Sequence, residues 1–411
     1  MAESRQEVMT PTAARELFPG LRDKVFLDAA CVSLLPVSAA EALDRLRDEM
    51  LSCPHRDASA HHIALDRTAQ TAREQIACLL HTRPENIALV ESTTHGLQIV
   101  ASSVSLEEGD NILIGSTEFM GLAIPWIPKQ HRQGFSIKVV PHREGRLSVD
   151  DFARVADSRT RMILLSSVQW NNGFRADLSA FSQFTEEKNI ILVVDAIQQL
   201  GAIDLDVEKT PCDFLVAGGH KWLNAPVGRG LLYVHPKRRD TLEPAHWGYL
   251  NVVEPESGWA EYFATPDIPP VRDYDFTGAA RRFETGGTAN YPGNVALAAS
   301  LQLINSIGIQ RIEQHIFRLG DRLVDALTSA GVEMISPTEA AARSGIVTFT
   351  LGDGPERDKQ LLNFLLDRRI LLSQRYTAGV GGLRVSVHFF NNEDDILALV
   401  DGVRAALKGR Q

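Results

Sequence analysis

The chain has 411 residues, of which 44% are hydrophobic, and it carries a formal net charge of −10 at pH 7. This length allows one large hydrophobic core and a smaller second one, and the composition is that of a globular protein rather than a disordered one. The acidic balance argues against an extended nucleic-acid-binding surface. The polar amino terminus and the short apolar runs predict a cytoplasmic protein with no secretion signal and no membrane span.

The cysteines are few and widely spaced. Cys31, Cys53, Cys78 and Cys212 show no metal-ligand spacing and are too sparse for a disulfide framework in a chain this long. We expect free, mostly buried thiols and no metal site.

Short apolar, β-branched runs alternate with longer stretches of helical periodicity through the first half of the chain. Most of the intervening stretches are long enough for a helix, but the last two runs are joined by a short turn region, which argues against a crossover helix there. The fold class is therefore α/β, with a seven-stranded, mostly parallel sheet in a large domain. The seven predicted strands are residues 86–92, 111–117, 136–142, 161–167, 189–196, 213–219 and 229–235.

The pattern changes after the seventh run. Residues 238–292 contain Pro, Gly and Trp in a weak pattern, which indicates a long ordered loop or an excursion that faces a partner. Helical periodicity returns over residues 293–331. Three more runs, closed by a final helix, predict a separate small sheet: 345–351, 369–375 and 382–388. The predicted parts of the chain are an N-terminal arm (1–24), a large domain (25–294) and a smaller α+β domain (295–411).

Polar side chains gather where predicted strands end. Asp195 ends the fifth strand and Gln198 follows it, His220 and Lys221 follow the sixth, and "STTHG" (92–96) follows the first. The carboxyl ends of parallel strands form a binding crevice, and a helix start rich in Ser and Thr suits a phosphate. A desolvated lysine is a nucleophile toward an aldehyde, and a buried aspartate can keep a pyridine nitrogen protonated. Pyridoxal 5'-phosphate would use such a set.

Five motifs then occur in an order that is typical of one enzyme group. They are "ESTTHGLQIVA", "VVDAIQQLG", "GGHKWLNAPVGRGLLYV", "RRFETGGTANYPG" and "LRVSVHFFNNEDDI". Over roughly residues 20–405 the chain resembles the class V aminotransferase and cysteine desulfurase group of fold-type I pyridoxal-phosphate enzymes. Its pattern is nearest to the isopenicillin N epimerase-like and C–S lyase members.

The resemblance implies roles around the cofactor ring. Lys221 forms the Schiff base, Asp195 partners the ring nitrogen, and Gln198 donates a hydrogen bond near the ring hydroxyl. His220, beside the lysine, is a second catalytic candidate, and the alternative for it is a role in packing and orientation. Phe119 stands where the desulfurases place a histidine over the ring. A phenyl ring can stack there but cannot relay a proton; the alternative for Phe119 is a plain core position.

The resemblance also implies contacts to the phosphate and to the substrate. Thr93, Thr94 and possibly His95 hold the phosphate, and Thr288 completes the phosphate site of the neighbouring subunit in a homodimer with shared active sites. Arg384 binds the α-carboxylate of a small amino-acid substrate, since a guanidinium is suited to bidentate recognition.

Departures from the group's pattern bear on the reaction. Residues 371–384 correspond to the desulfurase segment that carries the persulfide-forming cysteine, yet they contain none, and Cys31 is interpreted as structural. Gly218 replaces a serine that contacts the phosphate. The resemblance implies an external aldimine and a Cα carbanion, with β-elimination from a cysteine-type substrate as the favoured outcome. Transamination and epimerisation remain alternatives, and sulfur transfer through a protein persulfide is not expected.

Two other classes of function are disfavoured. A nicotinamide dehydrogenase would need a nucleotide-binding glycine motif, but no G-x-G-x-x-G follows the first strand and no P-loop occurs. A non-catalytic relative would be expected to lack Lys221 or Asp195, and both are present.

Overall fold

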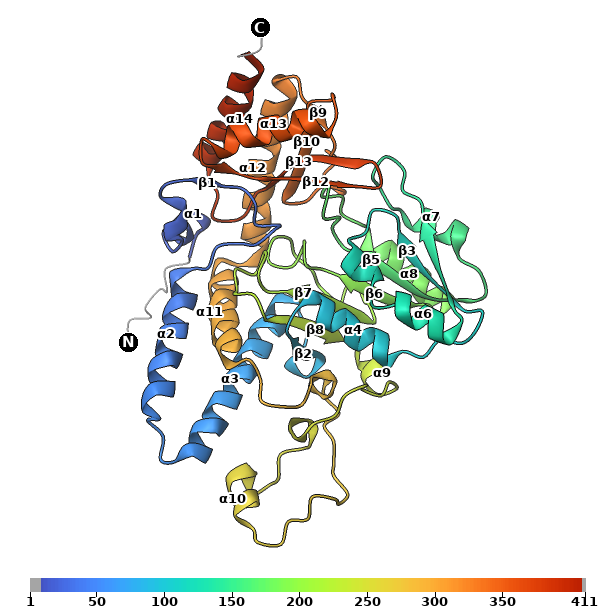
Figure 1. The fold of residues 1–411 in the computed structure, drawn as a ribbon, viewed down its shortest axis with the longest axis vertical. Helices are drawn as coiled ribbons and strands as arrows, with labels where there is room; N and C mark the ends of the chain where they lie inside the picture. The colour runs from blue at the N-terminus through green and yellow to red at the C-terminus, as the bar shows by residue number, and fades with distance from the viewer. Residues whose placement is uncertain (1–8, 409–411) are drawn as a thin grey trace, which may run out of the picture.

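The computed structural model describes residues 9–408, and its largest sheet has seven strands in the order β2-β8-β7-β6-β5-β3-β4 (Figure 1). All seven predicted strands of the large domain form, although most are shorter than predicted. They are β2 (Ile87–Val90), β3 (Asn111–Gly115), β4 (Ser136–Val140), β5 (Thr160–Ser166), β6 (Ile191–Asp195), β7 (Phe214–Gly218) and β8 (Gly230–Val234).

The sheet is mostly parallel, as predicted. Strand β8 pairs antiparallel with both β7 and β2, so β2 runs in the same direction as β7. The remaining pairs are parallel. The carboxyl ends of six strands therefore meet at one edge of the sheet.

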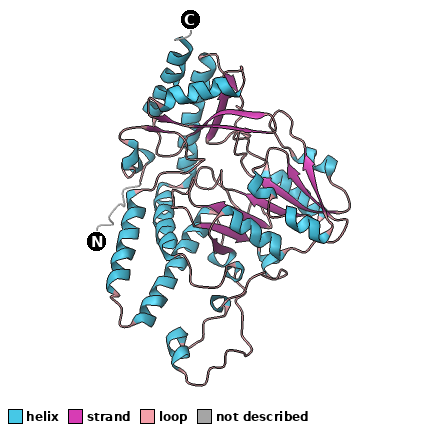
Figure 2. Ribbon diagram, viewed as in Figure 1, coloured by secondary structure: helices cyan, strands magenta, loops and turns pink. Residues whose placement is uncertain are grey.

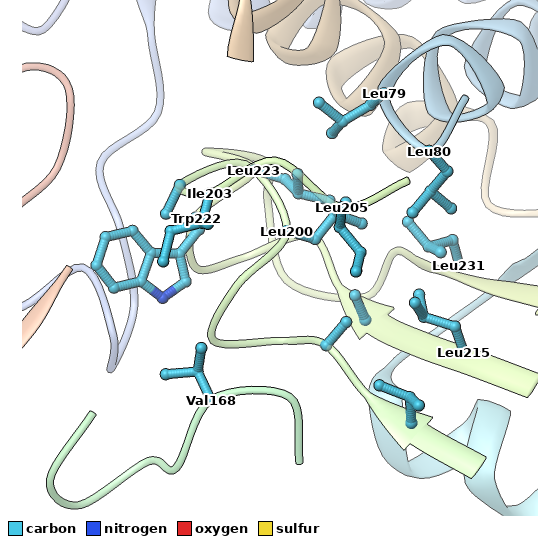
Figure 3. Close-up of a cluster of buried hydrophobic side chains, with 14 of the residues drawn as sticks. Leu79, Leu80, Val168, Leu200, Ile203, Leu205, Leu215, Trp222, Leu223 and Leu231 are labelled. Atoms are coloured by element: carbon cyan, nitrogen blue, oxygen red, sulfur yellow. The ribbon is translucent and has the colours of Figure 1, made fainter. Parts of the chain in front are cut away.

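Helices cover both faces of this sheet, because successive strand residues point to opposite sides. Leu113 packs into one core cluster, whereas its neighbours Ile112 and Ile114 pack into the other. Figure 3 shows part of the first cluster, where Trp222 lies near Leu200, Ile203 and Leu223. Trp222 directly follows Lys221 in the chain, so this core holds the segment that carries the lysine.

Fourteen α-helices and four short 3-10 helices occur in the described part of the chain. The long helices α2 and α3 pack against α11 (Figure 1). The α-helices up to β8 are α1 (Pro11–Arg15), α2 (Val37–Ser52), α3 (Ala58–Leu79), α4 (Thr93–Ser103), α5 (Met120–Ala123), α6 (Ile127–Gln133), α7 (Val149–Val155) and α8 (Leu178–Lys188). The 3-10 helices are η1 (Pro19–Leu21), η2 (Pro84–Asn86), η3 (Tyr249–Asn251) and η4 (Ala280–Phe283).

A second sheet has four antiparallel strands in the order β12-β13-β10-β9 and lies at the end of the molecule that carries the C-terminus (Figure 2). Its strands are β9 (Glu333–Met334), β10 (Ile346–Thr350), β12 (Ser373–Thr377) and β13 (Val380–Ser386). The later helices are α11 (Tyr291–Ile307), α12 (Ile309–Ser329), α13 (Pro355–Leu366) and α14 (Glu393–Lys408).

The predicted single strand over residues 369–375 is wrong, because the chain changes partner inside it. Strand β11 (Ile370–Leu371) pairs in parallel with β1 (Val25–Phe26), and after Leu372 the chain joins the four-stranded sheet as β12. An apolar pattern indicates which side chains are buried, but it does not identify the partner strand.

The predicted excursion contains short helices and loops. Besides η3 and η4 it includes the end of α9 (Pro236–Arg239) and all of α10 (Gly258–Ala264). Figure 1 shows α10 on a long loop at the opposite end of the molecule from the C-terminus. In residues 9–408 no single helix is long and apolar enough to cross a membrane; only α11 and α12 together, bent by 76° at their junction, reach that length and composition.

The thiols are free, as expected, but the prediction that most are buried is wrong. Cys53 and Cys78 are exposed, Cys31 is half-buried and only Cys212 is buried. Of the predicted N-terminal arm, residues 1–8 lie outside the described part.

Candidate active site

One cavity of about 400 Å³ opens at the carboxyl edge of the large sheet. Its walls come from the ends of several strands, from the start of α4 and from the four-stranded sheet. It is lined by most of the residues that the sequence singled out: Thr93, Thr94, Phe119, Asp195, Gln198, His220, Lys221 and Arg384.

Lys221 and Asp195 carry opposite charges in this cavity. Burial lowers the pKa of Lys221 to about 8, although the nearby Asp195 raises it. Burial raises the pKa of Asp195 to about 6. Two interactions lower this pKa and so oppose the effect of burial: the backbone N–H of Ile197 donates to Oδ1 at 2.9 Å, and Lys221 is positively charged. The lysine is therefore a far better nucleophile near neutral pH than an exposed lysine.

Trp222 anchors the segment that carries Lys221. Its indole is fully buried, and its Nε1 donates to Oε1 of Gln198 at 2.8 Å. Nε2 of Gln198 donates to the carbonyl oxygen of Ala30 at 3.2 Å. A Cβ at Gly218 would lie 3.1 Å from the ring of His220, so a serine there would crowd this half-buried histidine.

The start of α4 presents hydroxyl groups to the cavity. Ser92 caps the helix, because its Oγ accepts the backbone N–H of His95 at 3.1 Å. The Oγ1 of Thr93 is buried and has no hydrogen-bond partner in residues 9–408. A lone donor at a helix start is suited to an anion.

Two predicted site residues lie elsewhere. His95 and Thr288 line a second pocket, and the Nδ1 of His95 accepts the backbone N–H of Glu91 at 3.3 Å. The helical turn directs His95 away from the wall formed by Thr93 and Thr94. The structure thus gives the side chain of His95 no place in the main cavity.

Aromatic side chains form another wall. Phe119 is 43% exposed, which excludes the alternative of a plain core residue. It meets Trp170 edge to face, with ring centroids 5.4 Å apart. Glu118, which precedes Phe119 in the chain, is a buried carboxyl that accepts hydrogen bonds from Ser166 and Gln169. Burial raises the pKa of Glu118 to about 7.

Arg384 lies on β13 and is only 2% exposed. Its Nη1 donates to the carbonyl oxygen of Trp170 at 2.9 Å, and its Nη2 donates to Asp28 at 3.0 Å and to Ser373 at 3.1 Å. Its Nε has no partner in the described residues. Cys31, which was interpreted as structural, is a half-buried residue of the cavity wall.

Sequence reasoning missed three polar or aromatic residues that line this cavity, and also Glu118, which lies behind its wall and accepts a hydrogen bond from Ser166. Ser166 and Trp170 follow the same strand-end rule as Asp195, and Glu118 directly precedes Phe119, so an inspection of every strand end would have found them. Arg375 lies on β12 and lines the cavity. No local signal marks it, because its position depends on how the small sheet faces the large one.

These groups fit pyridoxal phosphate. The cofactor needs an amine of lowered pKa, a buried carboxyl group and phosphate donors at a helix start. Lys221, Asp195 and the unpartnered hydroxyl of Thr93 supply these features in one cavity.

The comparisons with known proteins agree with this chemistry. The profile of the family described as Aminotransferase class-V matches residues 25–399. An uncharacterized aminotransferase, YcbU, of Bacillus subtilis (strain 168) is 25% identical, over 96% of this chain and 98% of its own. A probable cysteine desulfurase of Methanothermobacter thermautotrophicus is 26% identical (94% and 95%), and an isopenicillin N epimerase of Streptomyces clavuligerus is 28% identical (93% and 97%).

Solved structures share the fold. A cysteine desulfurase from Thermococcus onnurineus NA1 in its apo form superposes with a TM-score of 0.83 at 23% identity, covering all of both chains. The cystine C–S lyase C-DES, in complex with its reaction product cysteine persulfide, has a TM-score of 0.82 at 24% identity, covering 94% of this chain and 99% of its own.

The chain belongs to the aminotransferase class-V family. It is an enzyme with the fold-type I architecture, and its cofactor is pyridoxal 5'-phosphate. The predicted family, fold class and cofactor are confirmed.

Proposed function

We propose that the protein is a C–S lyase that cleaves a small cysteine-type amino acid by β-elimination. The observation that carries the proposal is the single cavity in which an amine of lowered pKa, a buried carboxyl and a buried guanidinium face one another. An amine near Cα and a clamp for the α-carboxylate are what such a reaction requires of the protein.

Each residue has a task in this proposal. Lys221 holds the cofactor covalently, Asp195 pairs with its ring nitrogen, Gln198 lies near its hydroxyl, and Thr93 with Thr94 binds its phosphate. Pyridoxal phosphate, when bound, supplies a cationic ring that accepts the electron pair left at Cα.

Proton transfer falls to Lys221, once its amine is free. With its pKa lowered to about 8, a useful fraction of the amine is neutral near pH 7 and can take the Cα proton. His220, half-buried beside it, lines the same cavity and is the second catalytic residue of the proposal. Arg384 binds the α-carboxylate, and the wall of Phe119 and Trp170 limits the access of water to the reacting atoms.

Sulfur transfer, unlike elimination, needs a group on the protein that accepts the sulfur of the substrate. Residues 371–384 carry Ser373, Tyr376 and Thr377 but no cysteine, and a hydroxyl is a poor acceptor of sulfur. The comparisons do not support excluding the persulfide route, since several relatives are named cysteine desulfurases. Cys31 also lines the cavity, so the Cys31→Ala variant tests whether its thiol takes part.

The assembly and location are part of the proposal. We infer a cytoplasmic homodimer in which Thr288 of each chain serves its neighbour's phosphate site. Large apolar side chains on the excursion support this inference, because Trp247, Phe263 and Phe276 are well exposed in one chain. We also propose that the chain divides into a large domain, residues 25–294, and a small domain, residues 295–411.

The products of cysteine and of its S-conjugates test the reaction. β-Elimination releases pyruvate, ammonia and a thiol or sulfide, whereas desulfuration of cysteine through a persulfide leaves alanine. Transamination leaves pyridoxamine phosphate, and epimerisation shows as exchange of the Cα hydrogen in D₂O without release of pyruvate. A variant with all four cysteines changed to serine should keep most of the pyruvate formation. Alanine as the main product, lost in Cys31→Ala, would overturn the proposal.

The covalent role of Lys221 has its own test. The purified protein with pyridoxal phosphate should be yellow, and borohydride should remove the visible band and fix the cofactor to a peptide containing Lys221. Lys221→Ala should lack the band. Lys209→Ala, which changes an exposed lysine, is the matched control and should keep it.

A further inference from the structure

The hairpin formed by α2 and α3 carries three side chains of the kinds that bind metal ions. Glu49 lies in the last turn of α2, His55 in the connecting loop and His61 in the first turn of α3. Each side chain offers one ligand atom, and these three atoms lie within 4.8 Å of one another. Figure 1 shows this loop far from the C-terminus, and none of the three residues lines the main cavity. The cluster is therefore separate from the proposed chemistry.

One nitrogen atom of this cluster has no partner. Nε2 of His55 lies 2.8 Å from Oε1 of Glu49, and the rings of His55 and His61 have centroids 5.3 Å apart. Nδ1 of His61 is buried and makes no hydrogen bond within residues 9–408. Buried polar atoms are normally satisfied, so an unpartnered ring nitrogen beside a second imidazole and a carboxylate points to a ligand that all three groups share.

Packing against α11 holds the two helices that carry the cluster. Leu46 of α2, Leu65 of α3 and Tyr291 of α11 form a small buried hydrophobic cluster. Glu49 follows Leu46 by three residues and His61 precedes Leu65 by four, so each lies one turn from that cluster on the same side of its helix. The helices therefore bring Glu49 and His61 together without the help of an ion.

The chemistry of the donor atoms selects the metal. Calcium and magnesium prefer oxygen ligands, whereas two imidazoles with one carboxylate suit Zn²⁺. The side chains of Glu49 and His55 are 32% and 31% exposed, which leaves room for water as a fourth ligand. Ligand atoms of tetrahedral zinc lie about 3.4 Å apart, so rotation of these two partly exposed side chains has to draw the cluster closer.

We propose that Glu49, His55 and His61 form a zinc site that joins the end of α2 to the start of α3. The ion stabilises the folded chain, because only the folded hairpin presents the three ligands together. The prediction of no metal site rested on the spacing of the cysteines, and this site uses none of them.

Binding of zinc to the cofactor-loaded protein tests the site. After treatment with a chelator, calorimetric titration with ZnCl₂ should show a site with a dissociation constant of ~1 µM or below. Zinc should also raise the melting temperature. His55→Ala and His61→Ala should each weaken this binding ~100-fold or more and remove the rise in melting temperature, because each takes away one of three protein ligands. His131→Ala, at an exposed position on α6, is the matched control and should change neither result.

X-ray absorption at the zinc edge identifies the ligands in the wild-type protein, so the test does not depend on the folding of a variant. The spectrum should show two imidazole ligands and no sulfur. A sulfur ligand in this spectrum, no saturable binding at micromolar zinc, or unaltered binding in both histidine variants overturns the site.

Discussion

At the scale of single residues, desolvation is the main physical effect in this site. It moves the pKa of Lys221 down and that of Asp195 up, toward each other and toward neutral pH. Each shift favours the uncharged form, while the attraction between the two groups opposes both shifts. The balance produces an amine that reacts near pH 8.

The pH dependence of cofactor attachment follows from this balance. Only the neutral amine attacks an aldehyde, so the rate at which cofactor-free protein binds pyridoxal phosphate covalently should rise as pH increases through about 8 and level off above it. An exposed lysine would show the rise near its ordinary value of 10.5. Stopped-flow absorbance measures the rate, and Nα-acetyl-lysine controls for titration of the cofactor itself.

Asp195→Asn should shift that profile to lower pH. The aspartate raises the pKa of Lys221, so removal of its negative charge lets desolvation lower the pKa further. A midpoint that moves to higher pH in this variant would contradict the assigned pairing.

Arg384 combines a proposed substrate contact with a structural ion pair. Arg384→Ala should lower kcat/KM, mainly through a higher KM, because the carboxylate clamp is lost. The loss should correspond to about 2–4 kcal/mol of transition-state stabilisation. It should also lower the melting temperature, since Asp28 loses its partner. In the double variant with Asp28→Asn, the melting temperature should recover while KM stays high. Recovery of KM as well would show that Arg384 acts only through packing.

At the scale of elements, one glycine separates two long helices. Gly308 has a φ of 90°, lies between α11 and α12 and donates its backbone N–H to the carbonyl oxygen of Ile304 at 3.0 Å. The sequence predicted helical structure throughout residues 293–331, and the structure confirms it apart from this break. The break turns α12 toward the small sheet, whose core its Leu319 and Leu323 help to form.

A pair of glycine substitutions tests this element. Gly308→Ala should lower the free energy of unfolding by about 1–3 kcal/mol, because an L-residue is strained at that φ. Gly320→Ala, in the middle of α12, should raise it by about 1 kcal/mol at most, since alanine favours a helix. A Cβ at either position meets nothing within 4 Å, so steric clashes do not enter. Urea denaturation measures both; similar effects of the same sign would refute the conformational argument.

At the scale of the whole molecule, the proposed homodimer predicts complementation between defective chains. A hybrid dimer of one Lys221→Ala chain and one Thr288→Ala chain, isolated with two affinity tags, would have one site with both changes and one intact site. Its activity should be about half that of the wild type, because the intact site takes Lys221 and Thr288 from different chains. If each site used only its own chain, the hybrid would show half the activity of the Thr288→Ala dimer, and a fully active monomer in sedimentation would end the idea.

Much of the architecture could be predicted from local patterns. The seven strands of the large sheet, its mostly parallel direction and the positions of Lys221 and Asp195 follow from burial patterns and strand ends, which short stretches of sequence carry. The split of residues 369–375 between two sheets could not be predicted, because a pairing partner is a long-range choice.

The sequence by itself determined the family, the cofactor and the residues near the ends of the large sheet's strands, since those features depend on order along the chain. Only the tertiary structure decided what faces them across the cavity. It brings Arg375 and Cys31 to the same wall as Arg384, and it moves His95 to another pocket. The physical reason is that the docking of two sheets depends on the summed packing of distant segments, and no local pattern encodes that sum.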